Sequence, residues 1–129
     1  MPQPKWLPLN FILEIHSAQI AEHGGADGIR DEGLLESALS RPLNAFNYGV
    51  DDLCELAALY GCGIIQNHPF LDGNKRTGLV ALELFLELNG LRLMASDEET
   101  LATILAVASG EWSAPELTTW LRAQVAPVA

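Results

Sequence analysis

The sequence predicts an all-α protein in which about six helices pack into one compact domain of residues 1–129. A length of 129 residues fits a single domain. Apolar residues make up 49% of the chain, which is enough for a hydrophobic core. Apolar side chains recur at helical spacing almost throughout, and no repeat, low-complexity tract or linker interrupts them.

The first helix is expected at about residues 9–23. Phe11, Ile15 and Ala18 recur there at the i, i+4, i+7 spacing of one buried face. The glycine pair that follows tolerates the backbone of a helix C-terminus and ends the helix.

The second helix is expected at about residues 32–40, with Asp31 as its N-cap and Pro42 as its stop. Residues 42–50 then read as an irregular surface segment. It carries two aromatic residues, Phe46 and Tyr48. These aromatics either tuck into the core of an ordinary connection or belong to a flap that meets a target protein.

The third and fourth helices are expected at about residues 53–67, capped by Asp51 or Asp52, and residues 74–89. Both are apolar nearly all round, with Glu55 the one charged residue inside the third. Helices of this kind are buried in the middle of a fold. The loop between them is therefore held by rigid elements on both sides.

The C-terminal part is expected to contain a short extended piece at residues 91–94 and a fifth helix at residues 97–108. Ser113 and Glu116 form a capping box for a sixth helix that ends near residue 124. Residues 1–8 and 126–129 are expected to be terminal tails.

Charge and composition exclude several classes of function. A net charge of −10 argues against a nucleic-acid binder and against docking on an anionic membrane. Residues 1–8 lack the apolar core of a signal peptide, and no uncharged apolar run is long enough to span a bilayer. A cytoplasmic protein is expected.

The cysteines and two of the histidines carry no site of their own. Cys54 and Cys62 lie eight residues apart in one helix, about 12 Å along its axis, so they cannot form a disulfide and should stay reduced. His16 and His23 lack partners at metal-ligand spacing and are interpreted as surface residues.

The loop between the two central helices, together with the start of the fourth helix, carries the candidate chemistry. His68 is a candidate general base, because imidazole exchanges its proton near neutrality. Asp72 can hold Mg²⁺ or cap the fourth helix. The remaining candidates bind phosphate at a helix N-terminus, where anions are favoured: Gly73, Asn74, Lys75 and Arg76. Asn74 can instead orient the turn, and Lys75 and Arg76 can instead be a solvated charge pair.

The run from His68 to Thr77 resembles the signature of the Fic/Doc superfamily, His-x-Phe-x-Asp/Glu-Gly/Ala-Asn-Gly/Lys-x-x. With Lys75 after Asn74, it is most similar to the Doc (death-on-curing) toxin branch. Similarity extends over about residues 6–121. The resemblance implies a compact helical fold with ATP as co-substrate, Mg²⁺ and a cognate antitoxin as partner.

The resemblance also implies a reaction. Typical Fic enzymes have Gly at the position of Lys75 and a second Arg at that of Leu79, and they transfer AMP to a hydroxyl. Both departures are shared with Doc, which moves the γ-phosphoryl of ATP to a threonine of elongation factor Tu and halts translation. Gly73 departs from Doc, which has Ala there, and matches general Fic enzymes. Residues 42–50, with Phe46 and Tyr48, are then expected to be the target-binding flap.

Two alternatives remain open at this point. The first is nucleotidyl transfer by the same site, and the second is a non-enzymatic helical binding module. The inhibitory pattern of some Fic proteins, Ser/Thr-x-x-x-Glu-Gly/Asn, is absent, since Glu32 is the sole Glu followed by Gly or Asn and position 28 is Gly. Restraint by an antitoxin is therefore expected.

Overall fold

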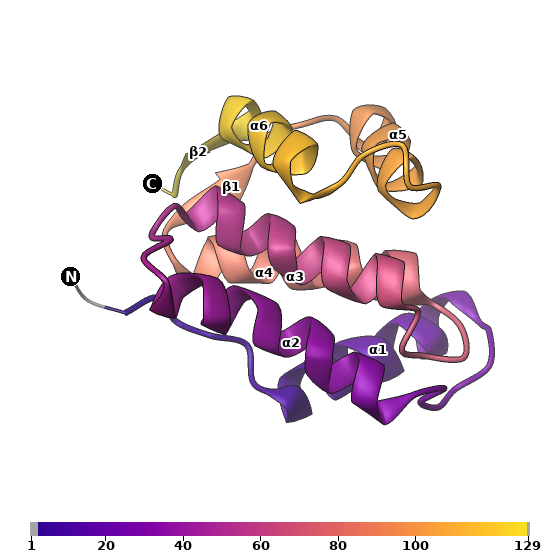
Figure 1. Cartoon of the computed structure of the whole chain (residues 1–129). Helices are drawn as coiled ribbons and strands as arrows, with labels where there is room; N and C mark the ends of the chain where they lie inside the picture. The colour runs from indigo at the N-terminus through magenta and orange to yellow at the C-terminus, as the bar shows by residue number, and fades with distance from the viewer. Residues whose placement is uncertain (1–2, 129) are drawn as a thin grey trace.

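The computed structural model describes residues 3–128, which form six α-helices and two short strands (Figure 1). The all-α prediction is confirmed. In chain order the elements are α1 (Leu9–His23), α2 (Glu32–Asn47), α3 (Leu53–Asn67), α4 (Asn74–Leu88), β1 (Leu91–Leu93), α5 (Asp97–Ala108), α6 (Ala114–Gln124) and β2 (Val125–Pro127).

Helix α3 is the centre of the fold and packs against α2, α4 and α6 (Figure 1). Ten of its 15 residues are buried, as its apolar pattern predicted. Glycines let α3 and α4 approach closely: a Cβ on Gly61 would lie 2.7 Å from Leu82 Cδ2, and one on Gly78 would lie 2.6 Å from Ile65 Cγ1. The pair of helices that carries the candidate loop is therefore tightly locked.

Most helix boundaries follow the predicted signals. Asp31 accepts a hydrogen bond from Leu34 N at 3.0 Å, and Asp52 accepts one from Cys54 N at 2.9 Å. The capping box of Ser113 and Glu116 is present. Local capping chemistry thus sets the start of α2, α3 and α6.

The second helix is longer than predicted, because Pro42 lies inside it and does not stop it. An interior proline costs about 3 kcal/mol by losing a hydrogen bond and crowding the preceding turn. Packing offsets this cost: Pro42 is buried, and the Phe46 ring packs edge-on against Trp6 with centroids 5.5 Å apart. The predicted irregular segment at residues 42–50 is therefore wrong for its first six residues.

The predicted tails are also wrong for the parts that the structure describes. Leu7 is buried and its amide donates to the Tyr60 hydroxyl at 3.1 Å. Lys5 and Asn89 exchange two hydrogen bonds. At the other end β2 pairs antiparallel with β1, so residues 125–127 are a strand. Hydrogen bonds to distant side chains hold the N-terminal segment, and backbone pairing holds the C-terminal one; the periodicity of the sequence cannot reveal either.

The buried face of α1 differs from the prediction. Ile12, Ile15 and His16 are buried, whereas Phe11 and Ala18 are exposed. The face is rotated because His16 is turned into the molecule. Within residues 3–128 no helix is both long and apolar enough to cross a membrane.

Candidate active site

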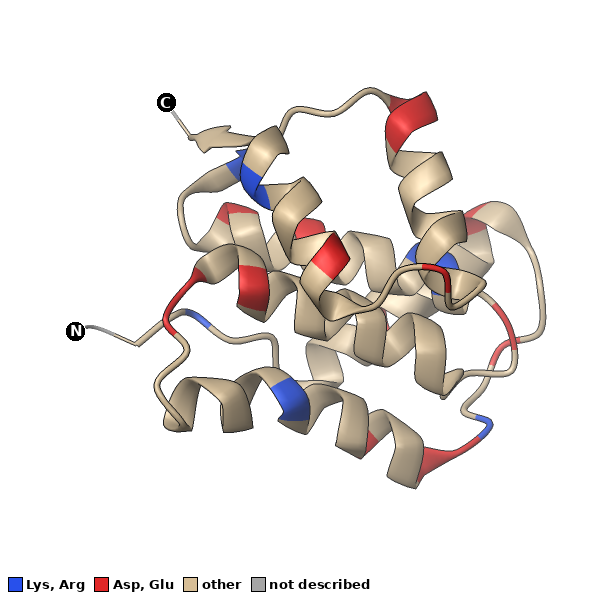
Figure 2. Ribbon diagram, turned by 45° about the horizontal axis from the view of Figure 1, so that its top comes forward, with Lys and Arg blue, Asp and Glu red and all other residues tan. Residues whose placement is uncertain are grey.

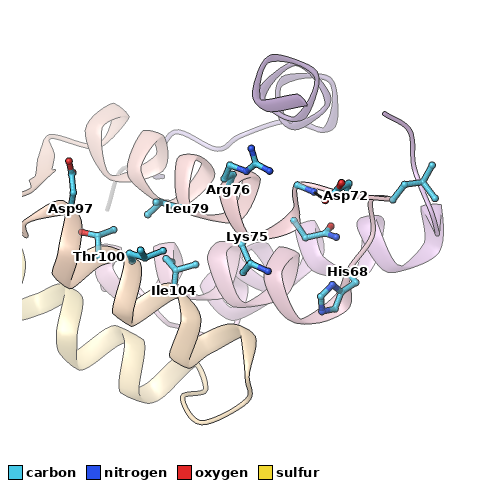
Figure 3. A pocket seen from close by; sticks show the side chains of 12 residues that line it. His68, Asp72, Lys75, Arg76, Leu79, Asp97, Thr100 and Ile104 are labelled. Atoms are coloured by element: carbon cyan, nitrogen blue, oxygen red, sulfur yellow. Dashed lines mark hydrogen bonds between the residues drawn. The ribbon is translucent and has the colours of Figure 1, made fainter. Parts of the chain in front are cut away.

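The motif loop, residues 68–73, joins α3 to α4 and lines a cavity of about 710 Å³ (Figure 3). Six of the eight predicted site residues line this cavity. Its walls are His68, Leu71, Asp72, Gly73, Asn74, Lys75, Arg76, Leu79, Asp97, Thr100, Leu101 and Ile104. The candidate base, carboxylate and cations thus converge on one space.

His68 ends α3 in a left-handed backbone conformation, with φ 51° and ψ 54°. It is the one non-glycine residue with positive φ among residues 3–128, and such a conformation costs roughly 1–2 kcal/mol. Its side chain is exposed and lines the cavity. A strained backbone that presents an accessible imidazole suits a general base.

Arg30 holds the end of α3, a role that sequence reasoning missed. Its guanidinium donates through Nε to His68 O at 2.6 Å and through a terminal nitrogen to Asn67 O at 2.9 Å. These carbonyls are left without partners where a helix ends, and a cation is favoured there. Arg30 therefore compensates the strained turn at His68.

The segment before α2 pairs with the loop by its backbone. Arg30 N donates to Pro69 O at 2.7 Å, Asp31 N to the same oxygen at 3.0 Å, and Leu71 N to Gly28 O at 3.0 Å. Phe70 is 1% exposed and anchors the loop in the core. The loop is thus fixed from a second direction, remote in sequence.

Asn74 orients the loop, the second of its two predicted roles. Its side-chain oxygen accepts from Phe70 N at 3.0 Å, and its amide nitrogen donates to Phe70 O at 3.1 Å. The side chain is committed to Phe70, so any contact with an anion falls to the backbone N–H.

The first turn of α4 offers free donors. Within residues 3–128 the amides of Asn74, Lys75 and Arg76 form no hydrogen bond. Gly73, at φ 76°, is the N-cap and supplies no side chain. Asp72 is therefore not the N-cap; its Oδ1 accepts from Gly73 N at 2.8 Å. An anion at this helix end would find three unsatisfied N–H groups.

The start of α4 is locally cationic in a molecule with a net charge of −10. Acidic residues are spread over the helices and connections, while basic residues are few (Figure 2). Lys75 is exposed, Arg76 is half-buried, and neither forms an ion pair within residues 3–128. In Figure 3, the Lys75 side chain points toward the side of the cavity where His68 lies. Two unpaired cations at the positive end of a helix favour a bound polyanion.

Helix α5 supplies an apolar wall that sequence reasoning did not assign to the site. Ile104 faces Leu79 of α4 across the cavity, with Thr100 and Asp97 on the same helix (Figure 3). Leu101 also lines the cavity. The helical spacing of Leu101 and Ile104 reads equally as core, so the sequence held no separate signal. On α4, one turn after Leu79, burial raises the pKa of Glu83, and the neighbouring Glu87 and Asp97 raise it further.

His16 is not a surface residue, contrary to the prediction. It is 2% exposed, its ring stacks on Phe70 with centroids 3.8 Å apart, and its Nε2 lies 2.8 Å from Asp72 O. Metal-ligand spacing was the wrong test for it. His23 is exposed, as predicted.

Phe46 and Tyr48 do not line this cavity. Both lie at the end of α2 near the start of α3, whereas the loop follows the end of α3, about 22 Å further along (Figure 1). Phe46 packs on Trp6, and Tyr48 is 92% exposed. A flap over the loop at these residues is therefore not supported by their positions.

The residues fit a magnesium ion that arrives with its ligand. Within residues 3–128 no group of three or more His, Cys, Asp or Glu side chains could hold a metal. Mg²⁺ commonly takes one or two carboxylates and completes its shell with phosphate and water. Two carboxylates line the cavity, Asp72 on the motif loop and Asp97 at the start of α5, and the exposed Asp72 can supply one such ligand.

Sequence comparison adds independent evidence. The pattern described as the Fic/DOC family matches residues 6–86. The chain is 35% identical to "Protein kinase doc" of Escherichia phage P1 over 112 residues, which is 86% of this chain and 88% of that protein. It is 44% identical to "Toxin Doc" of Mycolicibacterium smegmatis over 75 residues, about 57% of that protein's length.

The matched region contains the motif loop, all of α3, all but the last two residues of α4, and the Arg30 segment. Together, the matched pattern, the relative aligned over most of both chains and the six-helix fold show that this chain belongs to the Fic/DOC family.

Proposed function

We propose that the chain is the toxin of a toxin–antitoxin pair and transfers the γ-phosphoryl group of ATP to a hydroxyl of a translation factor. One observation carries the proposal. An exposed imidazole and the unsatisfied, cationic N-terminus of α4 line the same cavity. The names of the relatives, a protein kinase and a toxin, support the reaction class and the biological role.

Each step of the transfer has a group to perform it. The phosphates of ATP lie on the amides of the first turn of α4, with Lys75 and Arg76 beside them. Asp72 holds Mg²⁺, which neutralises charge on the phosphates when bound. Leu79, Leu101 and Ile104 offer an apolar wall to the nucleoside.

The chemical step is an in-line displacement at the γ-phosphorus. The target hydroxyl oxygen forms a bond to the γ-phosphorus as the bond to the β,γ-bridging oxygen breaks, and ADP leaves. The hydroxyl proton passes to the His68 imidazole. Lys75 adds a positive charge and a long side chain where typical Fic enzymes have Gly. The triphosphate therefore binds in a different position, with its γ-phosphorus next to the target hydroxyl.

Gly73 favours a second candidate, transfer of AMP, because general Fic enzymes carry Gly at this position. The two reactions leave different labels on the target. Purified chain is incubated with elongation factor Tu, the target that the family resemblance suggests, and with α-³²P or γ-³²P ATP. Label from γ-³²P alone supports phosphoryl transfer, whereas label from α-³²P supports nucleotidyl transfer.

A non-enzymatic binding module gives a third outcome: neither label transfers and the chain does not bind Mg·ATP. The same assay with a bacterial lysate in place of elongation factor Tu tests the target separately. Labelling of another protein from γ-³²P ATP would retain the reaction and replace the target.

The toxin role requires a cognate antitoxin in the cytoplasm, since the chain carries no inhibitory pattern of its own. Expression of the wild-type chain alone should arrest growth, and co-expression of the antitoxin should relieve the arrest. Normal growth with abundant soluble wild-type chain would contradict this role.

A further inference from the structure

His16 of α1 lies outside the signature loop but touches two of its residues. Its ring stacks on the Phe70 ring with an interplanar angle of 7° and centroids 3.8 Å apart. The side chain is almost wholly buried, with 2% of the residue exposed. A buried polar ring in such a position needs a hydrogen-bond partner, and it finds one on the loop.

The bond from His16 fixes one peptide of the loop. Nε2 lies 2.8 Å from Asp72 O, and a carbonyl oxygen can only accept, so Nε2 carries the proton. In a trans peptide the N–H points opposite to the C=O. With its carbonyl tied to α1, the Asp72–Gly73 peptide turns its N–H away from α1, to Asp72 Oδ1 at 2.8 Å.

Helix α1 also forms the floor beneath this peptide. A Cβ on Gly73 would lie 3.2 Å from Ile20 Cδ1 and 3.7 Å from His16 Cδ2. The glycine therefore sits directly on the α1 face. The other ring nitrogen, Nδ1, is 3.7 Å from Asp27 Oδ1, beyond hydrogen-bond distance, so within residues 3–128 Asp72 O is the one hydrogen-bond partner of the ring.

The geometry points to His16 as a positioning residue for the reaction. As the Nε2–H tautomer it holds the Asp72–Gly73 peptide so that the Asp72 carboxylate and the first turn of α4 face the cavity together. This inference rests on the proposed function for its consequence, because the position of Asp72 matters only where Mg·ATP binds. The bond itself does not depend on that function.

The tautomer can be read in the wild-type protein without nucleotide. Long-range ¹H–¹⁵N NMR spectra of the imidazoles should show His16 protonated at Nε2, with a slowly exchanging ring proton, and His23 in fast exchange. A proton on Nδ1 of His16, or fast exchange of the ring proton, would overturn the inference whatever the chain catalyses.

Two variants separate the hydrogen bond from the stack. His16→Phe keeps a flat ring on Phe70 and removes the donor, whereas His16→Gln keeps a donor and removes the ring. His23→Phe, on the exposed side of the same helix, is the matched control. Binding of a non-hydrolysable ATP analogue is measured by calorimetry with Mg²⁺ and with EDTA, beside thermal unfolding, kcat and KM.

His16→Phe should weaken binding in Mg²⁺ and lower kcat by roughly 10- to 100-fold, the usual effect of losing a partner of a metal ligand. The loss of affinity in EDTA should be smaller than in Mg²⁺. His16→Gln should keep part of the affinity and kcat that His16→Phe loses. Equal losses with and without Mg²⁺, or wild-type behaviour of His16→Phe, would refute the positioning role. If the wild-type protein binds no nucleotide, the proposed function fails, and the NMR spectra still show whether His16 donates to Asp72 O. If His16→Phe folds poorly, His16→Gln and the NMR spectra test the positioning role.

Discussion

At the scale of single residues, the proposed reaction depends on the exposed imidazole of His68 in a strained turn. His68→Ala should lower phosphoryl transfer by at least about 100-fold, because a positioned base contributes about 10²–10⁴-fold to such a step. Unfolding should change little, since the side chain is exposed. Rates are measured with γ-³²P ATP and stability by thermal unfolding, with His23→Ala as control; wild-type transfer by His68→Ala would remove its catalytic role.

Arg30 carries the second residue-scale prediction. Arg30→Ala removes both bonds to the end of α3 and should lower the free energy of unfolding by about 1–2 kcal/mol. Arg30→Ala should lower kcat more than it raises KM, because His68 loses its fixed position while the first turn of α4 stays intact. Arg30→Lys should recover part of the stability and little of kcat, since lysine lacks the planar fork.

The control for Arg30 is Arg92→Ala, an exposed arginine on β1 remote from the loop in sequence. Chemical denaturation and steady-state kinetics measure both effects. Equal changes for Arg30→Ala and Arg92→Ala would show that the bonds to Asn67 O and His68 O do not matter.

Cys62 gives a prediction about pH. Burial raises the pKa of its thiol to about 11, from an ordinary 9.0, with Arg41 lowering it and Glu116 raising it by smaller amounts. Between these values the unfolded chain loses the proton while the folded chain keeps it. The free energy of unfolding should therefore fall as pH rises from about 9 to 11. Urea titrations at pH 8, 9 and 10 should show a steeper fall for wild type than for Cys62→Ala.

At the scale of elements, capping chemistry and apolar pattern predicted the ends of α1, α3, α5 and α6 correctly. The same signals failed for the end of α2, because a proline stops a helix only where packing does not offset its cost. They also failed for the α1 face, where the bond from His16 to a distant carbonyl decides which side is buried. Contacts between distant segments are invisible to a local pattern.

The same division applies to the site. Its loop was evident, since a base, a carboxylate and two cations occupy nine consecutive positions. Arg30, His16 and the α5 wall were not evident, because they reach the loop only through tertiary packing. The residues of the predicted flap lie away from the cavity, because α2 continues through Pro42 to Asn47.

The crossing of α3 and α4 supports an element-scale prediction. Gly78→Ala would normally stabilise a helix by about 0.5–1 kcal/mol. Here the new methyl group would lie 2.6 Å from Ile65 Cγ1, so we expect a net loss of about 1–3 kcal/mol from overpacking. The double variant Gly78→Ala with Ile65→Ala should lose less free energy of unfolding than the sum of the losses of the two single variants. A double-mutant cycle in urea measures this difference. Strict additivity would place the strain elsewhere.

At the scale of the whole molecule, both ends of the described chain lie on the side of the fold away from the motif loop (Figure 1). β2 pairs with β1, and Val128 N donates to Gly90 O at 2.9 Å. Removing residues 125–129 should therefore lower Tm by on the order of 5 °C, in contrast to the behaviour of a free tail. Transfer at a temperature well below Tm should persist. An unchanged Tm would mean that the strand pair contributes no stability.

The motif loop is secured by α1 and by the backbone at residues 28–31, both some forty or more positions upstream. Contacts between such distant positions close slowly during folding. We therefore expect newly made chains to gain a working cleft only after their N-terminal third has docked. If the proposed toxin role holds, a partly folded chain would not be toxic to the cell, and toxicity would begin only when folding is complete.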